Sequence, residues 1–252
     1  MAVAASRKID YLLVDISNSY TKLAFASRQR VTRALRIRTS ELTAAALRRI
    51  LSRRSVHAVV VSSVVPARNA AVREAAKSLS ILFIDAKCEL GIGVDYPQPR
   101  SIGADRLANA AAAATLYGVP AVVVDFGTAV TFDVVSAAGN YIGGVIAPGL
   151  EAMTSFLYQR TALLPKLTLR EPESAIGKST RGAMLAGAVY GYRGLVREII
   201  AKIRTESFPR RKVRVVATGG YAQLIAQQLP EIEAVHERLT LDGLRLIANL
   251  NL

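Results

Sequence analysis

The chain has 252 residues but only one cysteine, Cys88, and no tryptophan. A single cysteine excludes an intramolecular disulfide, and this is typical of proteins that fold in the reducing cytoplasm. No apolar run approaches the roughly 20 residues that a membrane-spanning helix needs. The short apolar run near the N-terminus, 11–14, lies between Asp10 and Asp15 and is too short for a signal-peptide core. The sequence therefore predicts a soluble cytoplasmic protein without a membrane partner.

Acidic residues are also scarce, since 19 of them face 33 basic residues and leave a net charge of +14. Such a surplus attracts anions, and nucleic acid, an acidic membrane surface and phosphorylated substrates are the three candidates. The basic residues are spread over several stretches, among them 28–38, 48–54 and 210–214. No aromatic stacking platform and no zinc, basic-zipper or RNA-recognition signature accompanies them. Most are therefore expected to be solvated surface arginines, and nucleic acid is not the favoured partner.

The order of expected strands and helices repeats along the chain. Short β-favouring runs open the sequence, alternating helices and strands follow, and the pattern begins again at residue 121. Residues 14–21, VDISNSYT, align with residues 124–131, VDFGTAVT, at a constant offset of 110 (125 − 15 = 110). A duplicated strand–turn–strand unit predicts an α/β protein of two similar domains, 1–118 and 119–252, that face each other across a cleft. Two ordinary hairpins with an acidic turn residue remain the alternative.

The residues of the two repeats suit phosphate chemistry. Each copy ends an apolar strand in an aspartate, Asp15 or Asp125, and continues into a turn of small and hydroxyl residues. Backbone N–H groups and hydroxyls of such turns bind phosphate oxygens, and the carboxylate can hold the accompanying metal ion. Lys22 adds a positive charge just after the first turn. Phosphoryl transfer requires little more than positioning, charge neutralisation and a base for the attacking hydroxyl.

Two further segments carry candidate residues. Asp105 and Arg106 stand at the start of an alanine-rich helix, as a general base and an anchor for an anionic substrate, or simply as an acid favoured by the helix dipole. Gly219 and Gly220 follow an expected strand and would let a flat group such as adenine approach the backbone. A plain turn at a helix entry explains the two glycines equally well.

Taken together and in order, these segments resemble the motif series of the type III pantothenate kinases, within the actin, sugar-kinase and heat-shock-chaperone superfamily of ATPases. The segments that carry the resemblance are 15–22, 62–66, 96–99, 103–106, 125–129, 143–149, 177–180 and 217–220. The resemblance runs from about residue 12 to residue 247 and implies two duplicated ribonuclease-H-like domains around a central cleft. It implies transfer of the ATP γ-phosphate to pantothenate, forming 4'-phosphopantothenate in the first step of coenzyme A synthesis. It also implies Mg²⁺ with the nucleotide, a monovalent cation (K⁺ or NH₄⁺), and a homodimer with the active site near the subunit interface.

The resemblance assigns roles by position. Asp105 would be the catalytic base, and Asp125 would help to hold the monovalent cation. The residues expected around pantothenate are Tyr96, Gly103, Ala104, Arg106 and, from the partner subunit, Thr180. The residues expected to bind ATP and its Mg²⁺ are Asp15, Asn18, Ser19, Lys22, Gly127, Thr128, Gly219 and Gly220.

The first turn departs from the family's usual Asp-x-Gly-Asn-Thr, because Ser17 stands in place of glycine and Ser19 in place of threonine. A turn glycine often supplies a positive φ or lets a phosphate approach closely, and a side chain there costs on the order of 1 kcal/mol or more. Weakened use of ATP is the expected consequence. A second hypothesis is therefore a catalytically weak or inactive relative that acts as a regulator or binding protein, with a nucleic-acid association as a variant suggested by the charge. A third is a kinase of the same superfamily with another small anionic acceptor.

Overall fold

The computed structural model describes residues 9–252, which form two compact units. The first unit contains the described residues up to Thr115 and the C-terminal segment Arg238–Leu252, and the second is Leu116–Glu237. The last helix, α7 (Leu239–Asn251), is thus grouped with the first unit. The sequence-based boundary near residue 118 had left it with the second.

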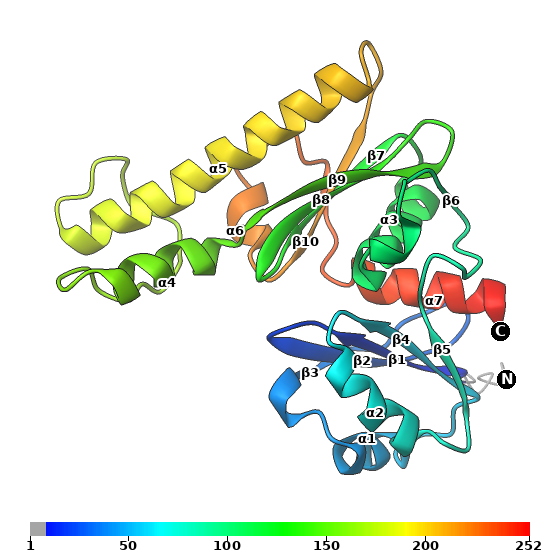
Figure 1. Ribbon diagram of the computed structural model, residues 1–252. Helices are drawn as coiled ribbons and strands as arrows, with labels where there is room; N and C mark the ends of the chain where they lie inside the picture. Colours follow the sequence, from blue (N-terminus) through cyan, green and yellow to red (C-terminus); the bar gives the residue numbers. More distant parts are fainter. Residues whose placement is uncertain (1–8) are drawn as a thin grey trace, which may run out of the picture. The chain divides into compact units, whose positions relative to one another are not determined.

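The first unit is built on a five-stranded sheet in the order β3-β2-β1-β4-β5. Its strands are β1 (Tyr11–Ile16), β2 (Tyr20–Ala26), β3 (Leu35–Arg38), β4 (Ala58–Ser63) and β5 (Ser80–Phe83). The first three are antiparallel neighbours, whereas β4 and β5 run parallel to β1. Helices α1 (Ala44–Leu51) and α2 (Pro66–Ala75) cover one face of this sheet, and α7 packs on the other (Figure 1). All six residues of β1 are buried because the strand lies between these two layers.

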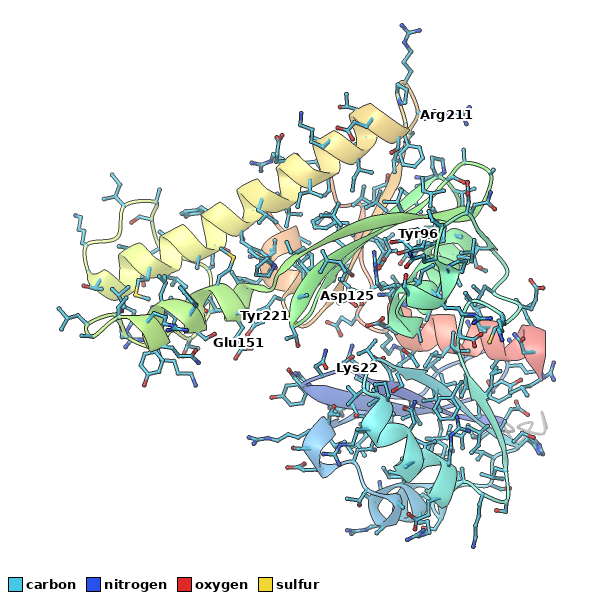
Figure 2. The ribbon with its side chains drawn as sticks, in the orientation of Figure 1. Lys22, Tyr96, Asp125, Glu151, Arg211 and Tyr221 are labelled. Carbon is cyan, nitrogen blue, oxygen red and sulfur yellow. The ribbon has the colours of Figure 1, made fainter. Side chains whose placement is uncertain are left out.

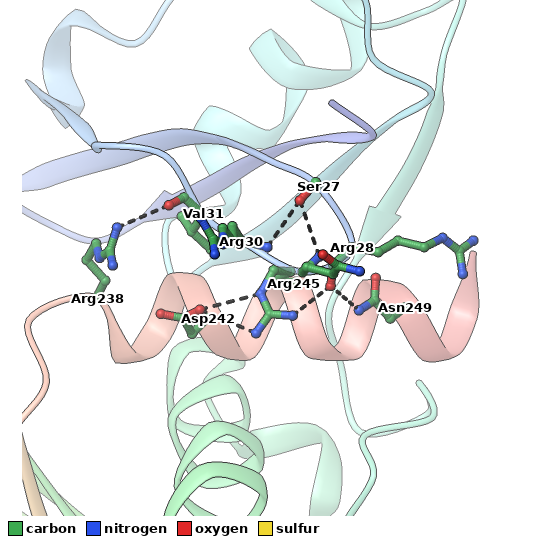
Figure 3. A network of polar contacts seen from close by, with 9 residues as sticks. Ser27, Arg28, Arg30, Val31, Arg238, Asp242, Arg245 and Asn249 are labelled. Carbon is green, nitrogen blue, oxygen red and sulfur yellow. Dashed lines mark hydrogen bonds and ion pairs between the residues drawn. The ribbon is translucent and has the colours of Figure 1, made fainter. Parts of the chain in front are cut away.

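Helix α7 and the residue before it are fixed to the segment after β2 by side-chain hydrogen bonds to backbone carbonyls (Figure 3). Arg245, only 8% exposed, donates to the Arg28 carbonyl at 2.8 Å, and Asn249 donates to the same oxygen at 2.8 Å. Arg238 donates to the Val31 carbonyl at 3.1 Å. Helix α3 (Ala104–Tyr117) packs against α7, where a Cβ at Gly243 would overlap the backbone of Ala108. Arg245 is therefore structural rather than solvated.

The second unit repeats the topology of the first. Its strands are β7 (Ala121–Phe126), β8 (Ala129–Val135), β9 (Asn140–Pro148), β10 (Arg214–Gly219) and β11 (Ala234–Val235). They lie in the order β9-β8-β7-β10-β11. Numbered from the first strand of its own unit, each sheet therefore has the same strand order, 3-2-1-4-5. Helices α5 (Thr180–Ser207) and α6 (Ala222–Ala226) supply side chains to the same buried core as β7, β8 and β10. The duplication predicted from residues 14–21 and 124–131 is thus present at the level of whole sheets.

An arm of two helices leaves this second sheet. Helix α4 (Leu150–Arg160) and the first half of the 28-residue α5 lie side by side and extend past the edge of the sheet (Figure 1). The segment between them is held by Arg193 of α5, which is 5% exposed and forms two hydrogen bonds to the Glu171 carboxylate, at 2.8 and 2.6 Å. These bonds lower the pKa of Glu171 below its ordinary value. The connection between α4 and α5 is therefore anchored by a charged pair.

Two helices expected from the sequence, over 104–117 and 150–160, agree with the structure to the residue as α3 and α4. The strand expected over 31–38 is shorter, because regular pairing begins only at Leu35 and Val31 forms an isolated bridge with Ala26. The remaining short elements are η1 (Thr39–Glu41), η2 (Pro99–Ser101) and β6 (Gly93–Val94). Among the described residues, no helix is both long and apolar enough to cross a membrane.

Candidate active site

The first hairpin, between β1 and β2, places its polar residues at one end of the sheet. Asp15 is 3% exposed near the end of β1, and Asn18 and Ser19 lie exposed in the turn that follows. The turn is closed by a hydrogen bond from the Ser17 N–H to the Tyr20 carbonyl at 3.2 Å. Lys22 lies directly opposite Asp15 in the strand register. Figure 2 shows Lys22 on the face of the sheet away from α1 and α2.

Ser17 does not have the backbone conformation that would demand glycine. Over residues 9–252, Arg210 is the one non-glycine residue with a positive φ. Ser17 is therefore not held in the left-handed region, and the backbone strain expected from the missing glycine is absent. The expected strain is therefore wrong, and four residues, 17–20, separate the paired Ile16 and Thr21.

A residue outside the predicted set, Thr39, holds this turn in place. Its hydroxyl donates to the Ser17 carbonyl at 2.6 Å and lies 3.1 Å from the Thr21 hydroxyl, while its N–H donates to the Ser19 carbonyl at 3.1 Å. Thr39 is 3% exposed and Thr21 is fully buried. One side chain thus fixes both arms of the turn. The sequence offers no local signal for this role, because the contact joins residues 22 positions apart.

The second hairpin, between β7 and β8, is one residue tighter. Phe126 pairs with Val130, so three residues, 127–129, form the turn. The Gly127 N–H donates to the Ala129 carbonyl at 3.1 Å, and a Cβ on Gly127 would stand 3.3 Å from that oxygen. Gly127 and Thr128 are exposed, and Asp125 is half-buried. The turn therefore presents the small residues that the sequence predicted, with little room for a side chain at Gly127.

Two glycines let neighbouring segments approach this hairpin closely. Gly219, with φ of +95°, ends β10 beside β7, and a Cβ there would lie 2.5 Å from the Asp125 carboxylate and 2.6 Å from the Phe126 backbone. A Cβ on Gly149 would overlap the carbonyls of Gly127 and Thr128. Gly220, by contrast, has open space around it. Next to this glycine pair, Tyr221 donates to the Glu151 carboxylate at 3.2 Å, and Figure 2 shows both side chains close to Asp125. The second unit thus gathers Asp125, Gly127, Thr128, Gly219 and Gly220 at one end of its sheet.

Asp105 lies in the first turn of α3, a position that suits both a general base and an acid favoured by the helix dipole. One carboxylate oxygen accepts the Arg106 N–H at 2.9 Å, as an acid at a helix start commonly does. The same oxygen passes so close to Gly103 that a Cβ there would lie 2.6 Å from it, so the glycine makes room for the carboxylate. Val64, from the 62–66 motif, is the next neighbour of that position, at 3.5 Å. Ala104 is buried, and Asp105 and Arg106 are half-buried. Tyr96, also half-buried, lies in the irregular segment between β6 and η2 of the same unit.

Thr180 does not join the other predicted residues of its unit. It is the first residue of α5, and Ser179 caps the helix by accepting the Gly182 N–H at 3.1 Å. This helix start is the end of α5 distant from the sheet that carries Asp125 (Figure 1). A cavity of 610 Å³ lies beside it, lined among others by Lys178, Arg181 and Leu185. Within one chain, Thr180 is therefore separate from the hairpin of its own unit.

Two arginines of the first unit lie over aromatic rings. The Arg36 guanidinium lies over the Tyr20 ring at 3.6 Å, and Arg73 lies over Phe83 at 4.4 Å. The sequence could not reveal these pairs, because each joins residues on different elements. Both are cation–π contacts within the first unit.

The oxygen donors of the first hairpin suit a nucleotide-bound Mg²⁺. Such an ion needs one or two carboxylates and takes its other ligands from phosphate and water. Asp15 supplies the carboxylate, and Asn18 and Ser19 stand beside it in the turn. In the described part of the chain, no three His, Cys, Asp or Glu side chains gather to form an all-protein cage. The donor set therefore fits a metal ion that arrives with its phosphate ligands.

The duplicated sheets with an acidic hairpin in each define an actin-like ATPase fold. Two solved structures share it over nearly the whole chain, and at their low identity they show the fold alone. One is a Campylobacter jejuni protein described as a Baf family transcriptional activator (TM-score 0.58, 19% identity, 94% of this chain and 97% of that one). The other is an inorganic polyphosphate/ATP-glucomannokinase from an Arthrobacter strain (TM-score 0.53, 13% identity, 96% and 99%). The fold class predicted from the sequence is confirmed.

Sequence comparison narrows the class to one family. The sequence model of the type III pantothenate kinases matches residues 11–202. A type III pantothenate kinase from Akkermansia muciniphila is 48% identical over 246 residues, which cover 96% of this chain and 99% of that protein. The chain belongs to the type III pantothenate kinase family. Membership in a kinase family implies ATP and a divalent metal ion.

Proposed function

We propose that this protein transfers the γ-phosphate of ATP to the primary hydroxyl of pantothenate and forms 4'-phosphopantothenate, the first step of coenzyme A synthesis. The observation that carries the proposal is the family match over residues 11–202, which includes Asp15, Asp105, Asp125 and Thr180. The resemblance to the Akkermansia enzyme along 96% of the chain supports it. The reaction takes place in the cytoplasm, in keeping with the single cysteine.

Asp105 is the general base in this proposal. The pantothenate hydroxyl oxygen attacks the γ-phosphorus, the bond to the β–γ bridging oxygen breaks, ADP leaves, and Asp105 accepts the hydroxyl proton. Gly103 leaves space for the Asp105 carboxylate. Arg106 provides a cation for the pantothenate carboxylate, and Gly103, Ala104 and Tyr96 contribute to the pantothenate pocket.

The two acidic hairpins bind the nucleotide and its cations. Asp15, Asn18 and Ser19 hold Mg²⁺ and phosphate oxygens, and Lys22 neutralises phosphate charge. In the second unit, Thr128 offers its hydroxyl to phosphate, and Gly127, which has no side chain, lets the phosphate approach the turn closely. Gly219 and Gly220 accept adenosine against the backbone, and Asp125 helps to hold a monovalent cation, K⁺ or NH₄⁺. During phosphoryl transfer, these residues would stabilise the negative charge on the metal-bound phosphates.

A homodimer is part of the proposal, and the helical arm supports it. The arm exposes apolar side chains, among them Phe156 (58% exposed), Leu163 (89%) and Ile176 (80%). Several large apolar side chains exposed on one part of a protein are typical of protein–protein contacts. Thr180, which the resemblance assigns to the partner's pantothenate pocket, begins α5 on the same arm. Light scattering is expected to give twice the chain mass of 27.0 kDa, and Phe156→Glu is expected to reduce it.

ATP consumption with Mg²⁺ and K⁺, measured with and without pantothenate, tests the activity. Turnover is expected only with pantothenate, and Asp105→Asn is expected to lower kcat by about 10²–10⁴-fold. Asp85→Asn, at an exposed aspartate of the same unit outside the site, is the matched control and should retain activity. Absence of pantothenate-dependent turnover at millimolar ATP would reject the proposal and favour a regulatory or binding role.

A further inference from the structure

The strand registers of the first unit align four polar side chains in one row. Asp15 on β1 is paired with Lys22 on β2, and Lys22 is paired with Arg36 on β3. On the other side, Asp15 is paired with Ser62 on β4. Directly paired residues project from the same face of a sheet. The row Ser62–Asp15–Lys22–Arg36 therefore crosses four strands on the face away from α1 and α2.

The outer end of this row is strongly basic. Tyr20 is paired with Arg38 in the same register, so Tyr20, Lys22, Arg36 and Arg38 form a block on one face of β2 and β3. Among the described residues, Lys22, Arg36 and Arg38 have no carboxylate within salt-bridge distance. Like charges directly opposite each other on adjacent strands destabilise a sheet. Stacking on Tyr20 positions Arg36, but among the described residues no carboxylate neutralises Lys22 or Arg36, whereas an anionic ligand would.

Arg36 is held in a defined position. Its guanidinium lies 3.6 Å from the centre of the Tyr20 ring, and Tyr20 follows directly on the turn residues 17–19. A stacked guanidinium loses less conformational freedom when it binds phosphate, and its planar set of donors matches phosphate oxygens. Helix α7 binds at the other end of this face, since its polar contacts reach residues 28 and 31, beyond the end of β2. The basic end is therefore the part that α7 leaves uncovered.

The inner end of the row contains a second unusual group. Ser62 is fully buried, yet its hydroxyl has no hydrogen-bond partner in the described structure. A buried hydroxyl without a partner is costly and is rare in proteins unless a ligand or water completes it. Its position next to Asp15 places this hydroxyl in the same polar row.

We infer that Arg36 is a second phosphate-binding cation of the first unit, and that the row from Ser62 to Arg36 binds the metal-bound triphosphate of the nucleotide. The inference rests on the proposed kinase function and extends it to residues outside the 15–22 segment. Asp15 lies at the metal-binding part of the row, Lys22 beside it, and Arg36 at the outer part. Arg36 binds phosphate directly, so its loss weakens any ligand that carries a polyphosphate and leaves adenosine unaffected.

Calorimetric binding of MgATP, inorganic tripolyphosphate and adenosine tests the inference without catalysis. Arg36→Gln is expected to weaken MgATP and tripolyphosphate by about tenfold, the loss of one charge-assisted hydrogen-bonding group, and to leave adenosine unchanged. Arg33→Gln removes the same charge from an exposed position of the same unit and is expected to change each affinity less than about twofold. Arg36→Lys keeps the charge without the planar group and should be intermediate.

A melting curve separates ligand binding from a structural role. Removing Arg36 relieves its repulsion with Lys22 and also removes the stacking on Tyr20, so the melting temperature should stay within about 3 °C. A large fall in melting temperature, or equal weakening by Arg36→Gln and Arg33→Gln, would overturn the inference. So would a wild-type protein that binds neither MgATP nor tripolyphosphate. If MgATP binds through Arg36 but pantothenate-dependent turnover is absent, the proposed function fails and the inference stands.

Discussion

The two acidic hairpins have the same residue spacing in the sequence but different strand registers. In the first, Asp15 is opposite Lys22, whereas in the second Asp125 is opposite Thr131. By the offset of 110, Thr131 corresponds to Thr21 rather than to Lys22 (131 − 110 = 21). The second turn is therefore one residue shorter, and a shift of one residue turns every following side chain to the other face of the sheet.

The shift gives equivalent residues different surroundings. Thr21 points to the buried side and meets the Thr39 hydroxyl at 3.1 Å, whereas Thr131 is on the side of Asp125 and donates to Asp133 at 3.3 Å. Lys22 appears on the polar face, while its counterpart by the offset, Phe132, is fully buried. Only the first hairpin therefore has a lysine beside its aspartate, and the comparison teaches that the repeat conserves topology but not the role of each position.

The two turns are also held by different physical means. Thr39 supplies hydrogen bonds to the first turn, while the second is enclosed by the backbones at Gly149 and Gly219. Variants at Thr39 and Gly219 therefore test the hydrogen bonds of the first turn and the close packing of the second turn independently.

The largest effect is expected at Gly219 of the second hairpin. In Gly219→Ala, the new Cβ would lie 2.5–2.6 Å from Asp125 and Phe126 at a φ of +95° that L residues rarely adopt. Unfolding by urea is expected to show a loss of about 2–4 kcal/mol. Gly220→Ala, with open space around its Cβ, is the matched control and should cost less than about 1 kcal/mol. Equal costs would show that close packing does not position this hairpin.

Thr39→Val should loosen the first hairpin and leave the second unchanged. The substitution leaves the Ser17 carbonyl and the Thr21 hydroxyl without a buried partner, at a cost of about 1–3 kcal/mol. Hydrogen exchange should become faster at residues 17–21 and stay the same at 127–131. Thr39→Ser keeps the hydroxyl and should restore slow exchange. Unchanged hydrogen exchange in Thr39→Val would show that the hydrogen bonds of the Thr39 hydroxyl do not hold the turn.

The smallest effect is expected from Ser17→Gly, which gives the first turn the glycine that the second turn has at Gly127. Ser17→Gly should change the KM for ATP less than about twofold, because Ser17 has no positive φ that glycine would relieve. Gly127→Ala should raise that KM more, since its Cβ would stand 3.3 Å from the Ala129 carbonyl in the tighter turn. A clear improvement of ATP use by Ser17→Gly would mean that the serine side chain itself obstructs phosphate.

Much of the fold was predictable because local patterns carried it. The apolar runs of β1 and β7 and the alanine-rich α3 each follow from nearby residues. The short β3 and the grouping of α7 with the first unit were not predictable in this way. The length of β3 depends on where antiparallel pairing with β2 stops. The grouping of α7 depends on contacts between residues more than 200 positions apart, such as the buried Arg245 and the Arg28 carbonyl.

By itself the sequence determined the duplicated strand–turn–strand units, the family and the candidate residues Asp15, Asp105 and Asp125, because motif order and spacing are local properties of the chain. Only the tertiary structure decided that Ser17 is free of backbone strain, that Thr39 clamps the first turn, and that Arg36 lies in one row with Lys22. These depend on turn length and strand register, which fix the face on which each side chain projects and which a repeat of residue types does not specify.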